Sequence, residues 1–137
     1  KGVAQEVLKQ GEDSRMSYDN DNIFAKILRG EIPCNKAYED DHALAFHDIN
    51  PQTPIHILVI PKGSYTSMDD FSANASDAEI AGFMRAVGHV ARENGIVEDG
   101  YRILANHGRD GHQEVQHFHV HVFGGKDLGR MIKPRDK

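Results

Sequence analysis

Three histidines alternate with apolar residues near the C-terminal end of the chain. His117, His119 and His121 are separated by Phe118 and Val120. A period of two is typical of a β-strand, on which residues two apart point to the same face. We therefore predict that the three imidazoles line one face of a strand, about 7 Å apart. The apolar residues between them would face the core.

Such a row is suited to chemistry at phosphorus. An uncharged imidazole is a competent nucleophile when one nitrogen is free and the other donates its proton to an acceptor. Crowding the histidines lowers the pKa values of at least some of them, because like charges repel. A phosphorus–nitrogen bond to histidine is labile, which favours a displacement in two steps. The neighbouring histidines can donate hydrogen bonds to the phosphate oxygens and stabilise the charge that develops there. His119 is the natural nucleophile, because it alone has a histidine on each side.

Metal binding is the alternative use of the same residues. A His-x-His pair on a strand supplies two zinc ligands, and a zinc site needs one or two more. His56 would supply the third ligand, alongside His117 and His119. The single cysteine, Cys34, excludes a Cys-x-x-Cys zinc site. On the residues alone, catalysis and metal binding both stay open.

Length and composition indicate one globular domain. The chain has 137 residues, of which 39% are hydrophobic, and carries a net charge of −5. The charge argues against a nucleic-acid partner, and the lack of a long apolar run argues against a membrane partner. Because there is one cysteine and no apparent secretory signal, we expect a cytoplasmic protein. We expect residues 1–20 to be a flexible extension and residues 21–137 to form the domain.

The remaining pattern predicts an α+β fold with a mainly antiparallel five-stranded sheet, one short helix and one long helix. Five segments have strand patterns: 36–39, 43–47, 55–61, 101–106 and the histidine row. The short helix, Ile23 to Arg29, follows a cap at Asp21–Asn22. The long helix begins at a capping box, Ser76 to Glu79, and runs to about Asn94. Residues 62–75 are expected to form a loop, and Gly88 suggests close packing of the long helix.

The histidine row, with several other segments, resembles the histidine-triad (HIT) superfamily. The similarity covers about residues 21–125, within the branch of histidine triad nucleotide-binding proteins, the purine nucleoside phosphoramidases. Glu114 and the segment 128–131 look more like a bacterial member. The segments that carry the resemblance are Ile23–Ile27, Glu31–Pro33, Ala45–Ile49, His56–Lys62, His117–Phe123 and Gly124–Gly125.

This resemblance implies a HIT fold, a homodimer with helix 76–94 at its interface, and a purine nucleotide substrate. The implied reaction is hydrolysis of a nucleoside 5′-phosphoramidate or an acyl-adenylate to the nucleoside monophosphate. It would pass through a nucleotidyl intermediate on His119 and would need no metal or cofactor. In this scheme His121 contacts the phosphate and His117 orients His119, supported by His56.

The resemblance also implies a nucleotide pocket. Asp48, which directly follows a predicted strand, would accept hydrogen bonds from the ribose hydroxyls. Glu114 stands where the eukaryotic members have serine, beside the expected phosphate. The other residues implied by the resemblance are Phe24, Ile27, Phe46 and Ile49 around the base, and Asn106 and Gln113 beside the ribose and phosphate.

Two other functions fit the same motif. One is a dinucleoside polyphosphate hydrolase of the fragile-histidine type, although Gly124–Gly125 favours the phosphoramidase branch. The other is a nucleotide-binding regulatory protein whose catalysis is incidental. An intact row of three histidines argues against a binder that has lost all activity.

Overall fold

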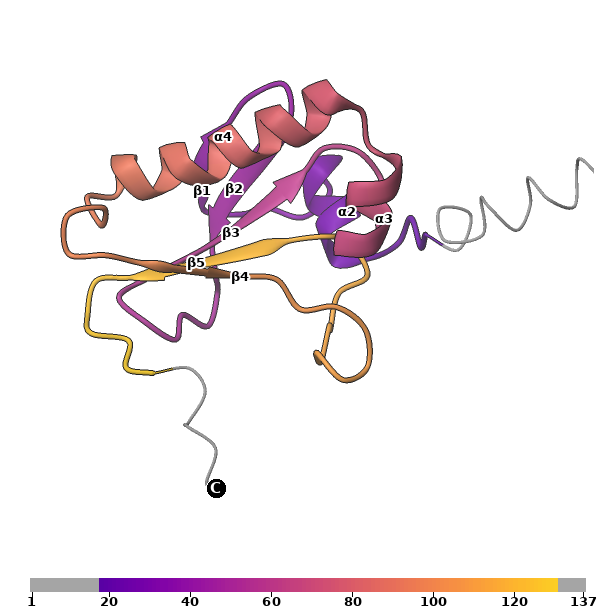
Figure 1. The fold of residues 1–137 in the computed structure, drawn as a ribbon. Coiled ribbons are helices and arrows are strands. Elements are labelled where there is room, and N and C mark those ends of the chain that lie inside the picture. The colour runs from indigo at the N-terminus through magenta and orange to yellow at the C-terminus, as the bar shows by residue number, and fades with distance from the viewer. Residues whose placement is uncertain (1–17, 131–137) are drawn as a thin grey trace, which may run out of the picture.

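The computed structural model describes residues 18–130, which form one antiparallel sheet flanked by helices (Figure 1). The strand order is β1-β2-β3-β5-β4, so β3 is central and β4 lies at one edge. The predicted α+β class and five antiparallel strands are confirmed. The strands are β1 (Lys36–Glu39), β2 (Ala43–His47), β3 (Ile55–Pro61), β4 (Arg102–Leu104) and β5 (Val120–Gly124).

Three helices are described: α2 (Ile23–Leu28), α3 (Met68–Asn74) and α4 (Asp77–Glu93). The Asn22 side chain caps α2, and the predicted capping box opens α4. The expectation of two helices is wrong, because α3 lies within the predicted loop 62–75. Its N-cap is Ser67, whose side chain accepts a hydrogen bond from the backbone N–H of Asp70. Within α3, Met68 and Phe71 are spaced i and i+3, but the i+4 position is Ser72, so the segment lacks the apolar stripe of a helix.

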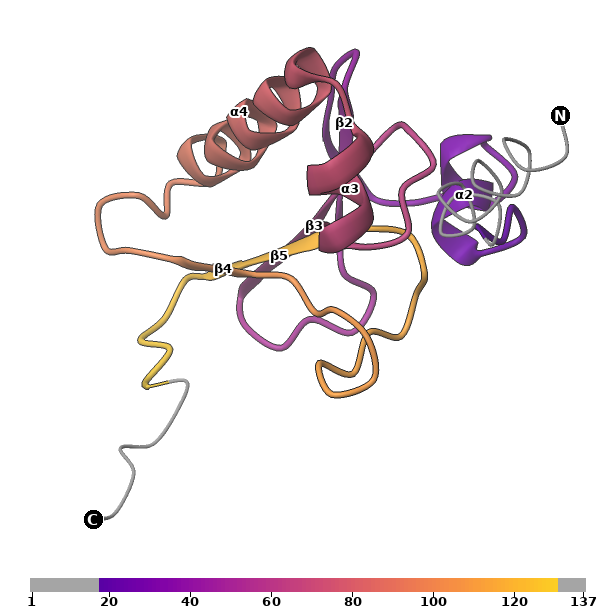
Figure 2. The ribbon, with the colours of Figure 1, turned by 45° about the vertical axis from the view of Figure 1, so that its right-hand side comes forward.

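The helices lie on opposite faces of the sheet, with α3 and α4 on one face and α2 on the other (Figure 2). On one face, α4 packs against a core that includes Ile57 and Val59 of β3. On the other face, Phe24 of α2 packs with Leu58 and Ile60 of the same strand. β3 is therefore buried on both faces, and the sheet separates two apolar clusters.

The histidine row enters the sheet later than predicted. β5 begins at Val120, so only His121 lies on the strand, while His117 and His119 precede it. The ladder stops because the Phe118 N–H donates to the Tyr65 carbonyl at 2.7 Å instead of to β3. The alternation itself is confirmed, since the apolar residues between the histidines face the α4 core. The predicted strand 101–106 is likewise shorter, covering only Arg102–Leu104.

The close packing expected at Gly88 occurs instead at Gly82 of the same helix. A Cβ on Gly82 would lie 2.3 Å from the ring of His42, whereas one on Gly88 would meet only the Arg92 guanidinium at 3.3 Å. None of the helices in residues 18–130 is both long and apolar enough to cross a membrane. Residues 1–17 of the expected extension lie outside the described residues, so the boundary at residue 21 stays a prediction.

Candidate active site

His117 is held by both ring nitrogens. Its side chain is fully buried, and Nε2 lies 2.9 Å from the carbonyl oxygen of Pro61, the last residue of β3. A carbonyl only accepts, so Nε2 carries the hydrogen and Nδ1 has the lone pair. The Tyr18 hydroxyl, 2.5 Å from Nδ1, is then the donor. Burial lowers the pKa of His117 to about 4, so the ring is neutral at pH 7.

His119 is oriented by the main chain of its neighbour. Its Nδ1 lies 2.7 Å from the His117 carbonyl oxygen, so Nδ1 carries the hydrogen and Nε2 keeps its lone pair. The ring is 6% exposed, and its edge-to-face partner is Phe24, with centroids 5.0 Å apart. Burial lowers the pKa of His119, which keeps the imidazole uncharged. His119 therefore has the tautomer and charge state of a nucleophile.

His56 and His121 form a second ordered pair. The Gln52 backbone N–H donates to His56 Nδ1 at 3.1 Å, so the neutral His56 ring carries its hydrogen on Nε2. That hydrogen is directed at His121 Nδ1, 3.0 Å away. The proton of His121 is consequently on Nε2. Burial, with the adjacent His119 and His56, lowers the pKa of His121 to about 4. The neutral His121 ring thus offers Nε2–H as a hydrogen-bond donor.

Asp48 faces this pair at the exit of β2. One carboxylate oxygen, Oδ2, lies 3.4 Å from His56 Nε2, and the other accepts the Asn50 N–H at 2.8 Å. Asp48 is therefore both a turn former and a negative charge beside the histidines. Its charge raises the pKa of His56, although burial outweighs it and the net shift is downward.

The tautomers bear on the metal alternative. The predicted ligands His117 and His56 are unsuitable, since His117 uses both nitrogens and His56 carries its hydrogen on the nitrogen that faces the site. A different group, Asp48, His56 and His121, has donor atoms within 4.8 Å of one another. To bind a metal there, His56 would have to move its hydrogen to Nδ1, opposite the Gln52 N–H. Two donors would then face each other, so the arrangement favours phosphate chemistry.

An apolar wall stands next to His119. Phe24 and Phe46 are in edge-to-face contact, with centroids 5.5 Å apart, and Ile27 packs against the same cluster. Ile49 is 92% exposed and does not belong to that cluster. The structure thus brings together three of the four residues expected to surround a base.

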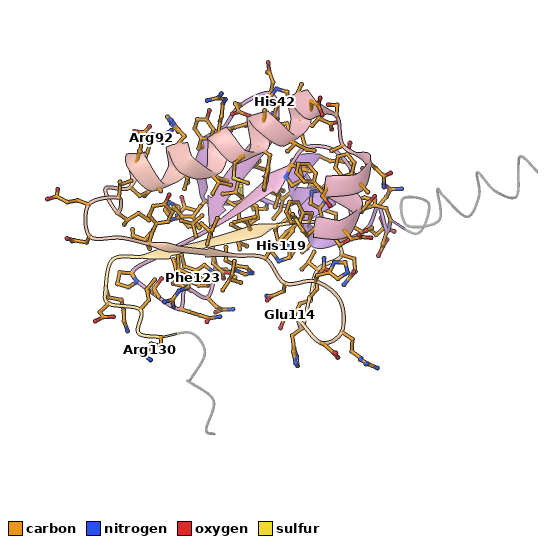
Figure 3. All side chains as sticks on the ribbon, in the orientation of Figure 1. His42, Arg92, Glu114, His119, Phe123 and Arg130 are labelled. Atoms are coloured by element: carbon orange, nitrogen blue, oxygen red, sulfur yellow. The ribbon has the colours of Figure 1, made fainter. Side chains whose placement is uncertain are left out.

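The segment before the histidine row carries the last three predicted residues. Gln113 is held within the chain: its amide donates to the Thr66 and Val115 carbonyls at 2.7 and 3.0 Å and accepts the Gly108 N–H. Glu114 is exposed in the loop close to His119 (Figure 3). Its charge slightly raises the pKa of His119 against the larger effect of burial. Asn106 is half-buried after β4.

Two side chains at the site did not emerge from the sequence. Tyr18 lies in the predicted extension, where no pattern distinguishes it. Phe123 stacks in parallel on His121 with centroids 5.6 Å apart and packs on His56 at 4.3 Å. Phe123 is two residues after His121, so the alternation placed it on the histidine face and was a usable signal.

A separate cavity of about 540 Å³ lies between the turn after α4 and the segment after β5. None of the histidine-row residues lines it. Its charged residues mix both signs, with Asp99 and Asp127 against Arg102 and Lys126. It therefore does not indicate a second site for an anion.

Known proteins share the sequence and the fold. A HIT-like protein of 13.2 kDa from Azospirillum brasilense is 67% identical over 116 residues, 85% of this chain and 95% of that protein. The purine nucleoside phosphoramidase of Escherichia coli is 44% identical over 112 residues, 82% of this chain and 93% of that enzyme. A HIT family hydrolase from Clostridium thermocellum superposes with a TM-score of 0.76 at 37% identity, covering 84% and 99% of the two chains.

The sequence pattern of the HIT domain matches residues 29–128. The match contains the whole histidine row, His56 and Asp48, and leaves out α2 and Tyr18. It agrees with the family expected from the histidine motif, and the superposition shows the same fold. This chain therefore belongs to the HIT domain family.

Proposed function

We propose that this protein hydrolyses the P–N bond of purine nucleoside 5′-phosphoramidates, or the mixed anhydride of acyl-adenylates, and releases the nucleoside monophosphate. The observation that carries the proposal is the state of His119. Its Nδ1 hydrogen is committed to the His117 carbonyl at 2.7 Å, and its Nε2 lone pair is available. The 44% identity to the E. coli purine nucleoside phosphoramidase supports the same reaction class.

The reaction would proceed by two displacements at the α-phosphorus. In the first, His119 Nε2 bonds to phosphorus and the bond to the leaving group breaks. A departing amine nitrogen takes up one proton from solvent, whereas the carboxylate that departs from an acyl-adenylate takes up none. In the second, water bonds to phosphorus, the bond to His119 breaks, and the surplus proton of water returns to solvent. His121 Nε2–H would donate to a phosphate oxygen in both steps and stabilise the developing charge.

Nucleotide recognition would use both sides of the row. Phe24, Ile27 and Phe46 offer an apolar surface for a base, with Ile49 able to cover it from the exposed loop. Asp48 Oδ2 would accept the ribose hydroxyls, with Asn106 nearby. Because the Gln113 amide is committed to three chain contacts, we propose that it shapes the loop around the phosphate. Glu114 would lie towards the leaving group, since its charge repels phosphate.

The test compares two substrates and one pair of proteins. Wild type and His119→Ala are incubated with adenosine 5′-phosphoramidate and, separately, with a diadenosine polyphosphate, and AMP release is followed. We expect turnover of the phosphoramidate by wild type and none by His119→Ala, with AMP binding retained in the variant. Near-wild-type activity of His119→Ala would contradict the nucleophile. A preference for the dinucleotide would indicate a polyphosphate hydrolase. Tight binding of AMP without turnover of either substrate would indicate a regulatory protein.

We also propose that the protein is a homodimer that uses α4 and the edge of the sheet. β4 is an edge strand, and edge strands are prone to pair with another chain. Exposed apolar side chains occur on both elements, with Met84 on α4 at 56% and Ile103 on β4 at 44%. Light scattering should give twice the chain mass for wild type and a lower mass for Met84→Glu/Ile103→Lys. A monomeric wild type would refute the dimer and leave the hydrolase proposal untouched.

A further inference from the structure

We propose that Tyr18 is a positioning residue for the histidine row: its hydroxyl holds the His117 ring, and through it the carbonyl that orients His119. Tyr18 lies ahead of α2 and outside the part of the chain that matches the HIT domain. It is nevertheless 7% exposed, packed edge-to-face on His117 with ring centroids 5.6 Å apart. Its importance for catalysis rests on the proposed function, whereas its effect on His117 does not.

The direction of the Tyr18 hydrogen bond follows from the partners. Pro61 offers His117 only a carbonyl, so the hydrogen of the neutral ring is on Nε2. Nδ1 is then an acceptor, and the hydroxyl 2.5 Å away must donate to it. With both nitrogens bonded, the ring is fixed between the segment before α2 and the end of β3. The tautomer in which Nδ1 carries the hydrogen would lose the bond to Pro61, because a lone pair on Nε2 would face the carbonyl oxygen.

Fixing this ring also fixes the adjacent main chain. The backbone carbonyl of His117 accepts the Nδ1 hydrogen of His119 at 2.7 Å, and this bond determines which His119 nitrogen is nucleophilic. The other aromatic neighbour, Phe24, contacts both histidines at centroid distances of 6.3 and 5.0 Å. A phenyl ring packs against the imidazoles but cannot select a tautomer, because it has no hydrogen-bonding group. Tyr18 is thus the side chain that bonds Nδ1.

The test is Tyr18→Phe in the full-length chain, which keeps the ring contact and removes the hydroxyl. The matched control is Tyr38→Phe. Tyr38 lies on β1, outside the histidine row, and its hydroxyl donates to the Asp40 carboxylate at 2.8 Å. Long-range ¹H–¹⁵N spectra follow the ring nitrogens of His117. In Tyr18→Phe, we expect the Nδ1 resonance to move to the higher chemical shift of an unbonded nitrogen. The control should leave it in place.

The kinetic arm measures AMP release from adenosine 5′-phosphoramidate. Loss of one hydrogen bond from the positioning network should lower kcat about 5- to 10-fold and leave KM within about twofold of wild type. The control should keep both constants. An unmoved Nδ1 resonance overturns the proposal, and so does a moved resonance with wild-type kcat. If wild type itself does not turn over the substrate, the proposed function fails, and the spectra alone decide whether Tyr18 holds His117.

A second substitution keeps the test decisive if Tyr18→Phe does not fold. Site-specific 3-fluorotyrosine at position 18 retains the shape of the side chain and makes its hydroxyl a stronger donor. We expect the His117 Nδ1 resonance to move to lower chemical shift, opposite to the effect of phenylalanine. No movement would show that the hydroxyl does not bond this nitrogen, and would overturn the proposal.

Discussion

The buried, neutral His117 should make the protein lose stability in mild acid. Burial lowers the pKa of this ring from 6.5 to about 4. Between those values the unfolded chain binds a proton that the folded chain does not, so stability rises with pH there and falls as pH drops through 6.5. Integrating this difference in bound protons from pH 7 to pH 5 gives a loss of about 2 kcal/mol from His117 alone.

The matched variant is His117→Gln, which does not titrate. Its amide can still donate to the Pro61 carbonyl and accept from the Tyr18 hydroxyl. Urea unfolding at one protein concentration gives the free energy of unfolding of both proteins at pH 7 and pH 5. We expect the wild type to lose about 2 kcal/mol more than the variant over this interval. The contributions of titrating groups that do not interact with His117 are equal in both proteins and cancel.

The interval above pH 7.5 provides the internal control. There the ring is neutral in the folded and unfolded chain, so the difference between wild type and His117→Gln should no longer depend on pH. Equal losses of stability between pH 7 and pH 5 would refute the reasoning. They would mean that His117 is protonated as readily in the folded chain as in the unfolded chain.

Two further predictions concern packing and loop structure. Gly82→Ala should destabilise the protein by about 1–3 kcal/mol, because its Cβ would lie 2.3 Å from the His42 ring. Gly88→Ala, on the same helix, should stabilise it by up to about 1 kcal/mol through helix propensity, and thermal or urea unfolding of both variants tests the contrast. Gln113→Glu should cost about 2–3 kcal/mol, because its carboxylate would face the Thr66 and Val115 carbonyls. The exposed Gln52→Glu is its control in the same assay, because the hydrogen bond at Gln52 comes from its backbone N–H, which the substitution keeps. Equal effects of the two would contradict the role of Gln113.

The sequence by itself determined the family and most of the local elements. Alternation placed the histidines and the core residues on opposite faces, since a strand has a period of two. Side-chain caps gave the starts of α2 and α4, because Asn22 and Ser76 act on backbone groups three residues away. Both boundaries of β1, β2 and β3 were predicted as the structure has them. These features depend on neighbours in the chain, and such neighbours are visible in the sequence.

Tertiary structure decided the hydrogen-bond directions at the site. The tautomer of His117 depends on Tyr18 and Pro61, which lie 99 and 56 residues away along the chain. The tautomer of His121 depends on its hydrogen bond with His56, which lies 65 residues away along the chain. The end of the β5 ladder depends on Tyr65, which takes the Phe118 N–H. No local pattern encodes such contacts, because they exist only once distant segments pack together.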